Sequence, residues 1–392
     1  MHIITWYNGV KIHRADKIIY GQFLQPHLVL STCRAGGGMV QGLEYVLNHQ
    51  SCEPCNHHRG AIHRDSAQYR AMICKPYGLA PEKCATMGTA ANMNHAAFVS
   101  RSFRDLTVSA VITGGVETNA GRAGDPASVY ETVDGFESLD GQGQVREPKP
   151  GTINIMLFIS HPLTPAALTR TIMMATEAKT AALQELAVNS RYSNGLATGT
   201  GTDQIIVSAP DRDGFRLGWA GKHGKLGELI GRTVMAGVKK TLARQNSLTP
   251  RGQASAKLHL ERFGCTTATM LEGIAGFLIP EQAALFCNNY RGIFRDPLTV
   301  AAVAAMVHLR DKFSWGVLPD SCWKEVMAAA AAQVACSISL RYEQMARYRD
   351  ILGRAAKAQG DELFLALCWQ AMALGFIDKW PEIGAEFRGD EK

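Results

Sequence analysis

The sequence predicts an α+β fold with mixed or antiparallel sheets and covering helices, followed by an all-α module at the C-terminus. Two observations predict it. Over about the first 240 residues, short β-branched runs alternate with glycine clusters and helical periods, which is typical of a mixed fold. After Pro250, alanine, leucine, methionine and glutamine dominate in a helical pattern. We therefore divide the chain into an α/β domain over 1–245 and a helical module over 246–392.

The strands of the first part are predicted from short runs that are rich in β-branched residues and bounded by glycine or polar residues. The predicted strands are Ile18–Tyr20, His27–Ser31, Val108–Thr113, Thr152–Ile159 and Asp203–Ser208. The segment from Gly135 to Pro150 is rich in acidic residues, glycine and proline. We expect it to form a surface loop directly before the fourth strand.

The helices are predicted from their start and stop signals. Thr164 is a typical N-cap, Pro165 takes the first helical position, and apolar residues recur at helical spacing as far as Leu186. A second amphipathic helix begins near Lys225. In the C-terminal part we expect five or six helices, with breaks at Pro280, Asp296-Pro297, Pro319 and Gly360.

The composition excludes several classes of protein. The chain has 392 residues, a net charge of +6, 46% hydrophobic residues and 19% charged residues, which is unlike a disordered chain. No run of five or more basic residues occurs, so we expect no nucleic-acid partner. The longest nearly charge-free apolar stretch, Val326–Leu340, is shorter than the roughly 20 residues of a membrane span. The N-terminus resembles no secretion leader, so we expect a cytoplasmic protein with reduced cysteines.

A Cys-x-x-Cys pair, Cys52 and Cys55, is followed by His57 and His58. Both thiolates of such a pair can reach one ion, and imidazole suits zinc or iron. Cys52, Cys55 and His58 are therefore a candidate metal site, although neighbouring histidines do not easily share one ion. The alternative is a polar loop with incidental cysteines, and nothing in the sequence requires a cofactor.

A first glycine-rich segment ends a predicted strand. Gly114 and Gly115 lead there to Asn119, Arg122 and Asp125. Glycines followed by polar groups at the end of a strand are common at binding sites. The alternative is an ordinary turn with a surface ion pair between Arg122 and Asp125.

A second glycine-rich segment, Ala197–Asp203, leads into a strand. Its small residues let a ligand approach the backbone, and its polar side chains offer hydrogen bonds. These side chains are Thr198, Thr200, Thr202 and Asp203. The glycines precede a strand rather than follow one, which disfavours a nucleotide-phosphate site. The alternative is a tight turn with threonine caps.

Polar residues also lie within the regular elements. Thr152 and Asn154 share one face of an apolar strand, where a buried amide needs a partner. Glu177 and Lys179 lie two positions apart on the first helix, so they point to different sides, and solvated charges are the alternative. His223 belongs to a basic, glycine-rich helix start that suits an anion or is simply solvated.

Taken together, these segments resemble the adenosylcobinamide amidohydrolase family over residues 25–240. The matching segments, in order, are Ser31-Thr32 with Gly36-Gly37-Gly38, Asn48-His49-Gln50, Gly88–Ala91, Thr113–Asp125, Gly151–Ile155, Glu177–Leu183, Ala197–Asp203 and Gly221–Gly231. The resemblance implies hydrolysis of the amide between the aminopropanol arm and the corrinoid of adenosylcobinamide. The products are adenosylcobyric acid and 1-aminopropan-2-ol, formed in corrinoid salvage, and the cobalt belongs to the substrate.

The candidate site follows from these segments. We expect catalytic roles for Thr152, Asn119, Asp203, Glu177 and Lys179. We expect substrate-binding roles for Asn48, His49, Gly114, Gly115, Arg122, Asp125, Asn154, Thr198, Thr200, Thr202 and His223. The resemblance assigns no role to the C-terminal helices.

A second resemblance bears on the mechanism. The succession of Gly151-Thr152, an apolar strand, a helix and Ala197–Asp203 is similar to the self-processing aminopeptidase and ornithine acetyltransferase group. It implies an αββα sandwich in which Thr152, exposed at a new N-terminus by self-cleavage, is the nucleophile. The segment Gly135–Pro150 would then be the loop before it, and Asn119 or backbone N–H groups would hold the oxyanion.

Three alternatives stay open. An activated water with Asp203 or Glu177 as base would perform the same reaction on an intact chain. A corrinoid-binding or carrier protein would use the same loops without catalysis. A self-processing acyltransferase or peptidase would use the same nucleophile on another substrate.

Apolar residues lie on several faces of the C-terminal helices, for example in Ala301–Val307, and lead us to expect a homodimer.

Overall fold

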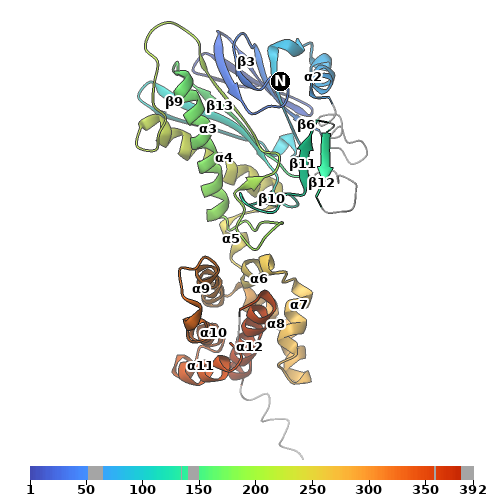
Figure 1. The fold of residues 1–392 in the computed structure, drawn as a ribbon, viewed down its shortest axis with the longest axis vertical. Helices are drawn as coiled ribbons and strands as arrows, with labels where there is room; N and C mark the ends of the chain where they lie inside the picture. Colours follow the sequence, from blue (N-terminus) through green and yellow to red (C-terminus); the bar gives the residue numbers. More distant parts are fainter. Residues whose placement is uncertain (52–64, 134, 140–149, 357–358, 381–392) are drawn as a thin grey trace, which may run out of the picture. The chain divides into compact units, whose positions relative to one another are not determined.

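The structure is a computed structural model that describes residues 1–51, 65–133, 135–139, 150–356 and 359–380 (Figure 1). The chain divides into two units, Met1–Thr249 and Pro250–Lys392. The division falls after Thr249, four residues beyond the boundary at residue 245 that we expected from the sequence. Each unit has its own core and is described by itself.

Two sheets form the centre of the first unit. One has the order β1-β2-β3-β6-β7 and consists of β1 His2–Trp6, β2 Val10–Ala15, β3 Ile18–Phe23, β6 Tyr45–Gln50 and β7 Cys84–Thr89. The other has the order β5-β4-β15-β13-β9-β8 and consists of β5 Gly38–Val40, β4 His27–Ser31, β15 Gln204–Pro210, β13 Ile153–Ile159, β9 Leu106–Gly114 and β8 Ala97–Phe103. The pairs β6–β7 and β13–β15 are parallel, and the other neighbours are antiparallel. The sheets are therefore mixed, as predicted.

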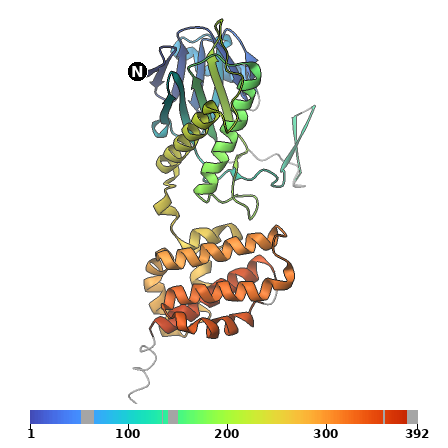
Figure 2. The same cartoon turned by 90° about the vertical axis from the view of Figure 1, so that its left-hand side faces the viewer.

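Helices cover the outer faces of the two stacked sheets. Apolar side chains of both sheets meet between them, among them Ile12, Val46, Met87, Val111 and Phe158. Helices α3 (Pro165–Glu185) and α4 (Lys225–Asn246) pack on the six-stranded sheet. Helix α2 (Ser66–Cys74) packs on the outer face of the five-stranded sheet. The layers follow the order helix, sheet, sheet, helix, which is the αββα sandwich that the second resemblance implies. In Figure 2, α3 and α4 lie in front of the strands of the first unit.

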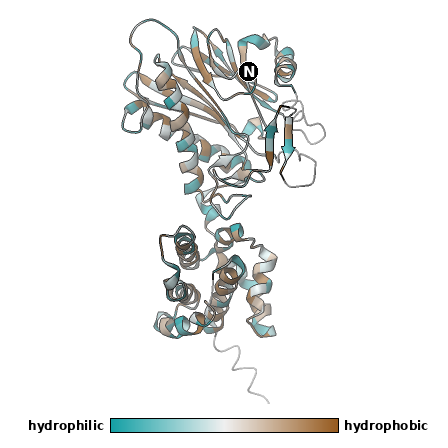
Figure 3. Ribbon diagram, viewed as in Figure 1, coloured by the Kyte–Doolittle hydropathy of each residue, from teal (hydrophilic) through white to brown (hydrophobic). Residues whose placement is uncertain are grey.

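Strand β13 lies at the centre of this sandwich and is buried on both faces, which explains its unbroken apolar sequence. Ile153 and Ile155 face α3 and α4, whereas Met156 faces the other sheet. The brown colour of the central strands in Figure 3 shows this apolar interior. Because successive residues alternate faces, Thr152 and Asn154 belong to the face between the sheets.

The predicted elements of the first unit are confirmed with small shifts of their ends. The five predicted strands correspond to β3, β4, β9, β13 and β15. Thr152 and Asp203 each stand one residue before the strand that they were expected to begin. The hydroxyl of Thr164 caps α3 by accepting a 3.2 Å hydrogen bond from the Ala167 N–H, and α4 begins at Lys225.

The segment Gly135–Pro150 differs in part from the expected loop. Its first residues form strand β12 (Gly135–Ser138), which pairs with β11 (Val129–Thr132) in an antiparallel hairpin. Pairing with an upstream strand is not visible in the composition of the segment itself, so the prediction was wrong there. Residues 140–149 lie outside the described residues.

A further short antiparallel sheet is formed by β10 (Ala120–Gly121) and β14 (Gly199–Thr200).

The second unit is helical, as predicted. Its α-helices are α5 Pro250–Gln253, α6 Ala256–Leu260, α7 Thr267–Ala275, α8 Pro280–Arg295, α9 Pro297–Ser314, α10 Trp323–Ser339, α11 Met345–Gly353 and α12 Asp361–Lys379. Short 3₁₀ turns across the two units are Lys75–Tyr77, Pro81–Lys83, Met93–His95, Glu261–Phe263, Asp320–Cys322 and Tyr342–Gln344. Pro280 and Pro297 begin helices and Gly360 precedes one, as their stop and start signals indicate.

The core of this unit is formed by side chains such as Phe286, Met306, Met327, Phe364 and Cys368. Among the described residues, no single helix combines the length and apolar composition that a membrane span needs. Helices α8 and α9 meet those requirements only as a pair, with a bend of 76° between them.

Candidate active site

The candidate site forms where three strands of the six-stranded sheet meet the loops beside them. Strands β13 and β15 are parallel with Asn154 opposite Gln204, so Thr152 and Thr202 precede them side by side. Strand β9 runs antiparallel to β13 and ends at Gly114, opposite Ile153. The next residue, Gly115, donates its N–H to the Thr152 carbonyl at 3.1 Å.

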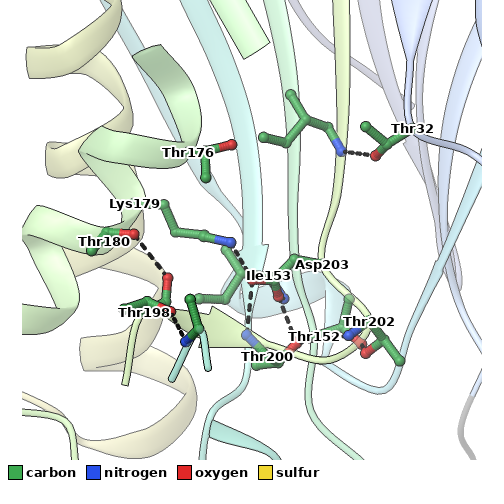
Figure 4. Close-up of polar contacts among 12 residues, drawn as sticks. Thr32, Thr152, Ile153, Thr176, Lys179, Thr180, Thr198, Thr200, Thr202 and Asp203 are labelled. Atoms are coloured by element: carbon green, nitrogen blue, oxygen red, sulfur yellow. Dashed lines mark hydrogen bonds and ion pairs between the residues drawn. The ribbon is translucent and has the colours of Figure 1, made fainter. Parts of the chain in front are cut away.

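Asp203 is the centre of the hydrogen bonds in this site (Figure 4). Its Oδ1 accepts from the Ile153 backbone N–H at 2.7 Å and from the Thr200 hydroxyl at 2.6 Å. Its Oδ2 accepts from the Thr200 backbone N–H at 2.9 Å and from the Lys179 ammonium, with which it forms an ion pair. Both charged side chains are only 8% exposed. Four donors therefore occupy the carboxylate and hold it in one orientation.

Gly199 makes room for this buried ion pair. A Cβ on Gly199 would lie 2.5 Å from Asp203 Oδ2 and 2.6 Å from Lys179 Nζ. Real side chains do not approach that closely, so only glycine fits beside the pair. Gly199 is thus required because the side chains of Asp203 and Lys179 approach its Cα closely, not because its backbone has an unusual φ.

The carbonyl of Gly151 accepts two hydrogen bonds from side chains. Asn119 Nδ2 donates to it at 3.0 Å and Thr202 Oγ1 at 2.9 Å. Gly151 has a φ of 143°, which glycine adopts readily, and its carbonyl precedes Thr152 directly. Thr152 Oγ1 lies 2.6 Å from Thr202 Oγ1. Because Thr202 gives its proton to Gly151, the Thr152 hydroxyl is the donor in that contact.

The orientation of Asn119 is set by a residue that the sequence did not indicate. The Tyr192 hydroxyl donates to Asn119 Oδ1 at 2.8 Å, which leaves Nδ2 directed at the Gly151 carbonyl. Asn119 is 4% exposed, so its amide requires partners at both ends. Tyr192 lies in the connection between α3 and β14 and belongs to no motif, so only its contacts reveal it.

Asp125 supports the same connection. It accepts from the Arg122 backbone N–H at 2.7 Å and from the Ser190 hydroxyl at 2.6 Å. Burial alone would raise the pKa of the Asp125 carboxyl, but hydrogen bonds from Ser190, Ser193 and the Arg122 backbone hold that pKa below its usual value. Asp125 is thus a structural acceptor beside the site rather than half of a simple surface ion pair.

Arg122 and Thr198 lie at the edge of the site. The Thr198 hydroxyl accepts from the Ala123 N–H at 2.9 Å, and its carbonyl accepts from Thr180 on α3 at 3.0 Å. The Arg122 side chain is exposed and passes over Gly195, where a Cβ would lie 2.5 Å from Arg122 Cδ. Of these two, only Arg122 presents a charge to solvent.

Asn48 and Asn154 connect the two sheets beside Thr152. Asn154 Nδ2 donates to Asn48 Oδ1 at 2.9 Å and to the Gly88 carbonyl at 3.0 Å, and Asn48 donates to the Thr113 hydroxyl at 2.8 Å. Both asparagines are fully buried. The Nδ2 end of the amide that the strand pattern singled out therefore has two partners, whereas its buried Oδ1 has none among the described residues. The donor end makes Asn154 part of the support of the site.

Three predicted residues lie elsewhere. His49 points to the other face of its strand, where Nδ1 lies 2.6 Å from the Tyr69 hydroxyl on α2. Glu177 is exposed and forms an ion pair with Lys222, because two positions on a helix turn a side chain by about 200° away from Lys179. These two side chains do not point to the Thr152 site.

His223 is the third. It is exposed and precedes the first turn of α4, whereas Gly114 packs against Thr241 and Leu242 in the last turns of that helix. The residue before His223, Lys222, forms its ion pair with Glu177 on α3. His223 itself is not among the side chains that bond to Thr152, Thr202 or Asp203.

Within the described residues, no group of three or more His, Cys, Asp or Glu side chains is arranged to hold a metal ion. Cys52, Cys55 and His58 lie outside the described residues.

Comparison with known proteins shows the family to which this chain belongs. A family model described as "Adenosylcobinamide amidohydrolase" matches residues 4–250. The chain belongs to the adenosylcobinamide amidohydrolase family. The match covers the whole αββα unit and stops where the helical unit begins, so the family relationship is carried by the first unit.

A relative and a solved structure are similar to the chain. An uncharacterized protein of Methanocaldococcus jannaschii, MJ1613, is 34% identical over 237 residues, which are 59% of this chain and 88% of that protein. Among solved structures, the PH0078 protein from Pyrococcus horikoshii OT3 is similar at 9% identity, over 62% of this chain and 82% of that one, with a TM-score of 0.29. A likeness of that size bears on neither fold nor function.

Membership of the adenosylcobinamide amidohydrolase family places the chain among the hydrolases and implies a corrinoid substrate. Four of the eight segments that resemble this family surround Thr152: the end of β9, the start of β13, the middle of α3 and the Ala197–Asp203 segment. These pieces are far apart in the sequence, and the ends of β13 and β15 bring them together.

Proposed function

We propose that this protein hydrolyses adenosylcobinamide to adenosylcobyric acid and 1-aminopropan-2-ol by acyl transfer to Thr152. One observation carries the proposal: two side-chain donors, Asn119 Nδ2 and Thr202 Oγ1, meet at a carbonyl oxygen directly beside the Thr152 hydroxyl. Donors that converge on an acyl oxygen next to a nucleophile are what amide hydrolysis requires. Family membership supports the choice of substrate.

The reaction has two steps. Thr152 Oγ1 attacks the carbonyl carbon of the substrate amide, and the developing oxyanion is held by Asn119 and Thr202. The C–N bond breaks, the nitrogen takes up the proton that the hydroxyl loses, and 1-aminopropan-2-ol departs. Water then cleaves the corrinoid ester at Thr152, which releases adenosylcobyric acid and restores the hydroxyl.

The base for this reaction is the α-amine of Thr152, which becomes free when the Gly151–Thr152 bond is cleaved. In the intact chain the Gly151 carbonyl itself occupies the position between the two donors. Attack by Thr152 Oγ1 on that carbonyl would convert the peptide bond into an ester and free the amine. Water would then hydrolyse the ester, leaving one chain that ends at Gly151 and one that begins at Thr152.

The surroundings of Asp203 favour this route over an activated water. Four donors occupy the Asp203 carboxylate, so no acceptor position is left for a water molecule. Glu177, the other base considered, is exposed and paired with Lys222. Asp203, held by Lys179, instead fixes the backbone of Ile153 directly after the nucleophile.

The experiment is an assay of aminopropanol release from adenosylcobinamide together with the intact mass of the purified protein. We expect turnover by the wild type, a chain cleaved before Thr152, and loss of both in Thr152→Ala. Thr152→Ser keeps the hydroxyl and should retain measurable activity. Thr169→Ala, which changes an exposed threonine bonded only to its own helix at the start of α3, is the matched control.

The outcomes separate the other functions. Full activity in Thr152→Ala, with an intact chain, would remove Thr152 from the mechanism and favour an activated water. Tight binding of the corrinoid without turnover would indicate a carrier protein. Turnover of N-acetylornithine or small peptides without turnover of the corrinoid would indicate an acyltransferase or peptidase.

A further inference from the structure

We propose that Tyr192 is a positioning residue of this site: its hydroxyl fixes the Asn119 amide so that Nδ2 faces the acyl oxygen. This inference rests on the proposed function and adds to it a residue from outside the segments that resemble the family. The contact that supports this role is the 2.8 Å hydrogen bond from the Tyr192 hydroxyl to Asn119 Oδ1.

An asparagine amide presents an acceptor at one end and a donor at the other, and only the donor end stabilises an oxyanion. In the intact chain both ends of the Asn119 amide are occupied, Oδ1 by Tyr192 and Nδ2 by the Gly151 carbonyl. Once the chain is cleaved after Gly151, that carbonyl is no longer tied to Thr152. Among the described side chains, Tyr192 is then the hydrogen-bond partner that keeps Nδ2 aimed at the substrate.

The position of Tyr192 is set by the backbone rather than by a free side chain. The residue before it, Arg191, donates its N–H to the Ala120 carbonyl at 2.9 Å, and Ala120 follows Asn119 directly. The Tyr192 N–H donates to the Ser190 hydroxyl at 3.1 Å, and Ser190 in turn donates to Asp125 at 2.6 Å. The connection that carries Tyr192 is therefore anchored to the short strand β10, which directly follows Asn119.

The tyrosine ring lies close to this strand: a Cβ on Gly121 would meet the ring at 3.4 Å, an ordinary van der Waals contact. The ring is nevertheless 43% exposed. Replacing Tyr192 by phenylalanine thus removes one hydroxyl from a partly solvated position and leaves no buried cavity. The variant should fold normally, so its kinetics report on the hydrogen bond.

The test is a double-mutant cycle on Tyr192 and Asn119, measured by the kcat and KM of corrinoid hydrolysis. We expect Tyr192→Phe to lower kcat about tenfold, the effect of one neutral hydrogen bond, with KM unchanged. We expect Asn119→Ala to lower kcat about 10²–10³-fold. In the double variant, Tyr192→Phe should not lower kcat below that of Asn119→Ala, because the amide that Tyr192 orients is absent. Tyr342→Phe, a tyrosine of similar exposure (46%) in the helical unit, is the control.

An unchanged kcat in Tyr192→Phe, or effects that multiply in the double variant, would overturn the positioning role while leaving the proposed function intact. Full turnover in Thr152→Ala would instead overturn the proposed nucleophile. If the wild type does not turn over the corrinoid, the same cycle is measured on the rate of cleavage before Thr152. A wild type with neither reaction would overturn both proposals.

Discussion

Ile153 donates its backbone N–H to Asp203 Oδ1 at 2.7 Å, although the two residues are 50 positions apart. This bond holds the start of β13 against the residue that precedes β15. Thr152 is the residue immediately before Ile153, so its hydroxyl is placed by a carboxylate that it does not itself touch. Lys179 and Thr200 hold that carboxylate in turn.

Breaking the ion pair of Lys179 and Asp203 should destabilise the first unit. Lys179→Met leaves a buried carboxylate without its counter-ion, so we expect the free energy of unfolding to fall by about 3 kcal/mol. Urea unfolding measures the loss. Lys222→Met, which breaks an exposed pair with Glu177, should cost about 0–1 kcal/mol. Equal losses in the two variants would contradict a structural role for the buried pair.

Gly199→Ala should disturb the same pair without removing a charge. The added Cβ would need to share space with Asp203 Oδ2 and Lys179 Nζ, so we expect a loss of about 1–3 kcal/mol in the free energy of unfolding. Gly201→Ala is the matched control, because a Cβ on Gly201 meets no atom within 4 Å. If Gly199→Ala were as stable as Gly201→Ala, the close approach would be of no consequence.

Thr202→Val should impair both cleavage of the chain and turnover. The substitution keeps the shape of the side chain but removes the donor to the Gly151 carbonyl and the acceptor for Thr152. We expect each rate to fall about 10²–10³-fold, as for loss of one oxyanion donor, and Thr202→Ser to recover most of it. Rates are read by intact mass and aminopropanol release. A fully active Thr202→Val would show that the hydroxyl is not a donor in the reaction.

The stability of the protein should depend on pH through His27. Burial lowers the pKa of His27 from 6.5 to about 4, and a hydrogen bond with the Gln25 carbonyl offsets part of this effect. Below pH 6.5 the unfolded chain therefore binds a proton that the folded chain does not. Stability that is present above pH 6.5 is lost as the pH falls toward 4, by about 3 kcal/mol in total.

The measurement compares the free energy of unfolding of the wild type and of His27→Phe between pH 7 and pH 4.5. Phenylalanine does not titrate, so the variant should lack this part of the pH dependence and keep the part due to other groups. Parallel curves for the two proteins would show that His27 is not the group responsible.

Much of the fold could be predicted because its signals are local. Thr164 and Pro165 marked the start of α3, and Pro280, Pro297 and Gly360 marked starts in the helical unit. The two-residue separation of Glu177 and Lys179 indicated that they point to different sides, and they do: Lys179 is buried, whereas Glu177 is exposed. The strand β12 was missed because its partner, rather than its own composition, makes it a strand.

Less of the site could be predicted. The sequence indicated Thr152, Asn119, Thr202 and Asp203 as separate candidates but not the bonds that join them. His49 and His223 stand in segments that resemble the family, yet His49 bonds to Tyr69 and neither histidine is a hydrogen-bond partner of Thr152. Tyr192 gave no signal, because a tyrosine in a loop has no pattern around it.

Many of the elements and the family could therefore be recognised from the sequence, since periodicity, capping residues and ordered motifs are properties of neighbouring positions. The tertiary structure alone decided which polar groups meet. Asn119 and Tyr192 are 73 positions apart and Lys179 and Asp203 are 24 apart. Such contacts depend on how β13 and β15 pair and on how α3 packs over them. The hydrogen bonds of the site are therefore a property of the packed sandwich rather than of any one segment.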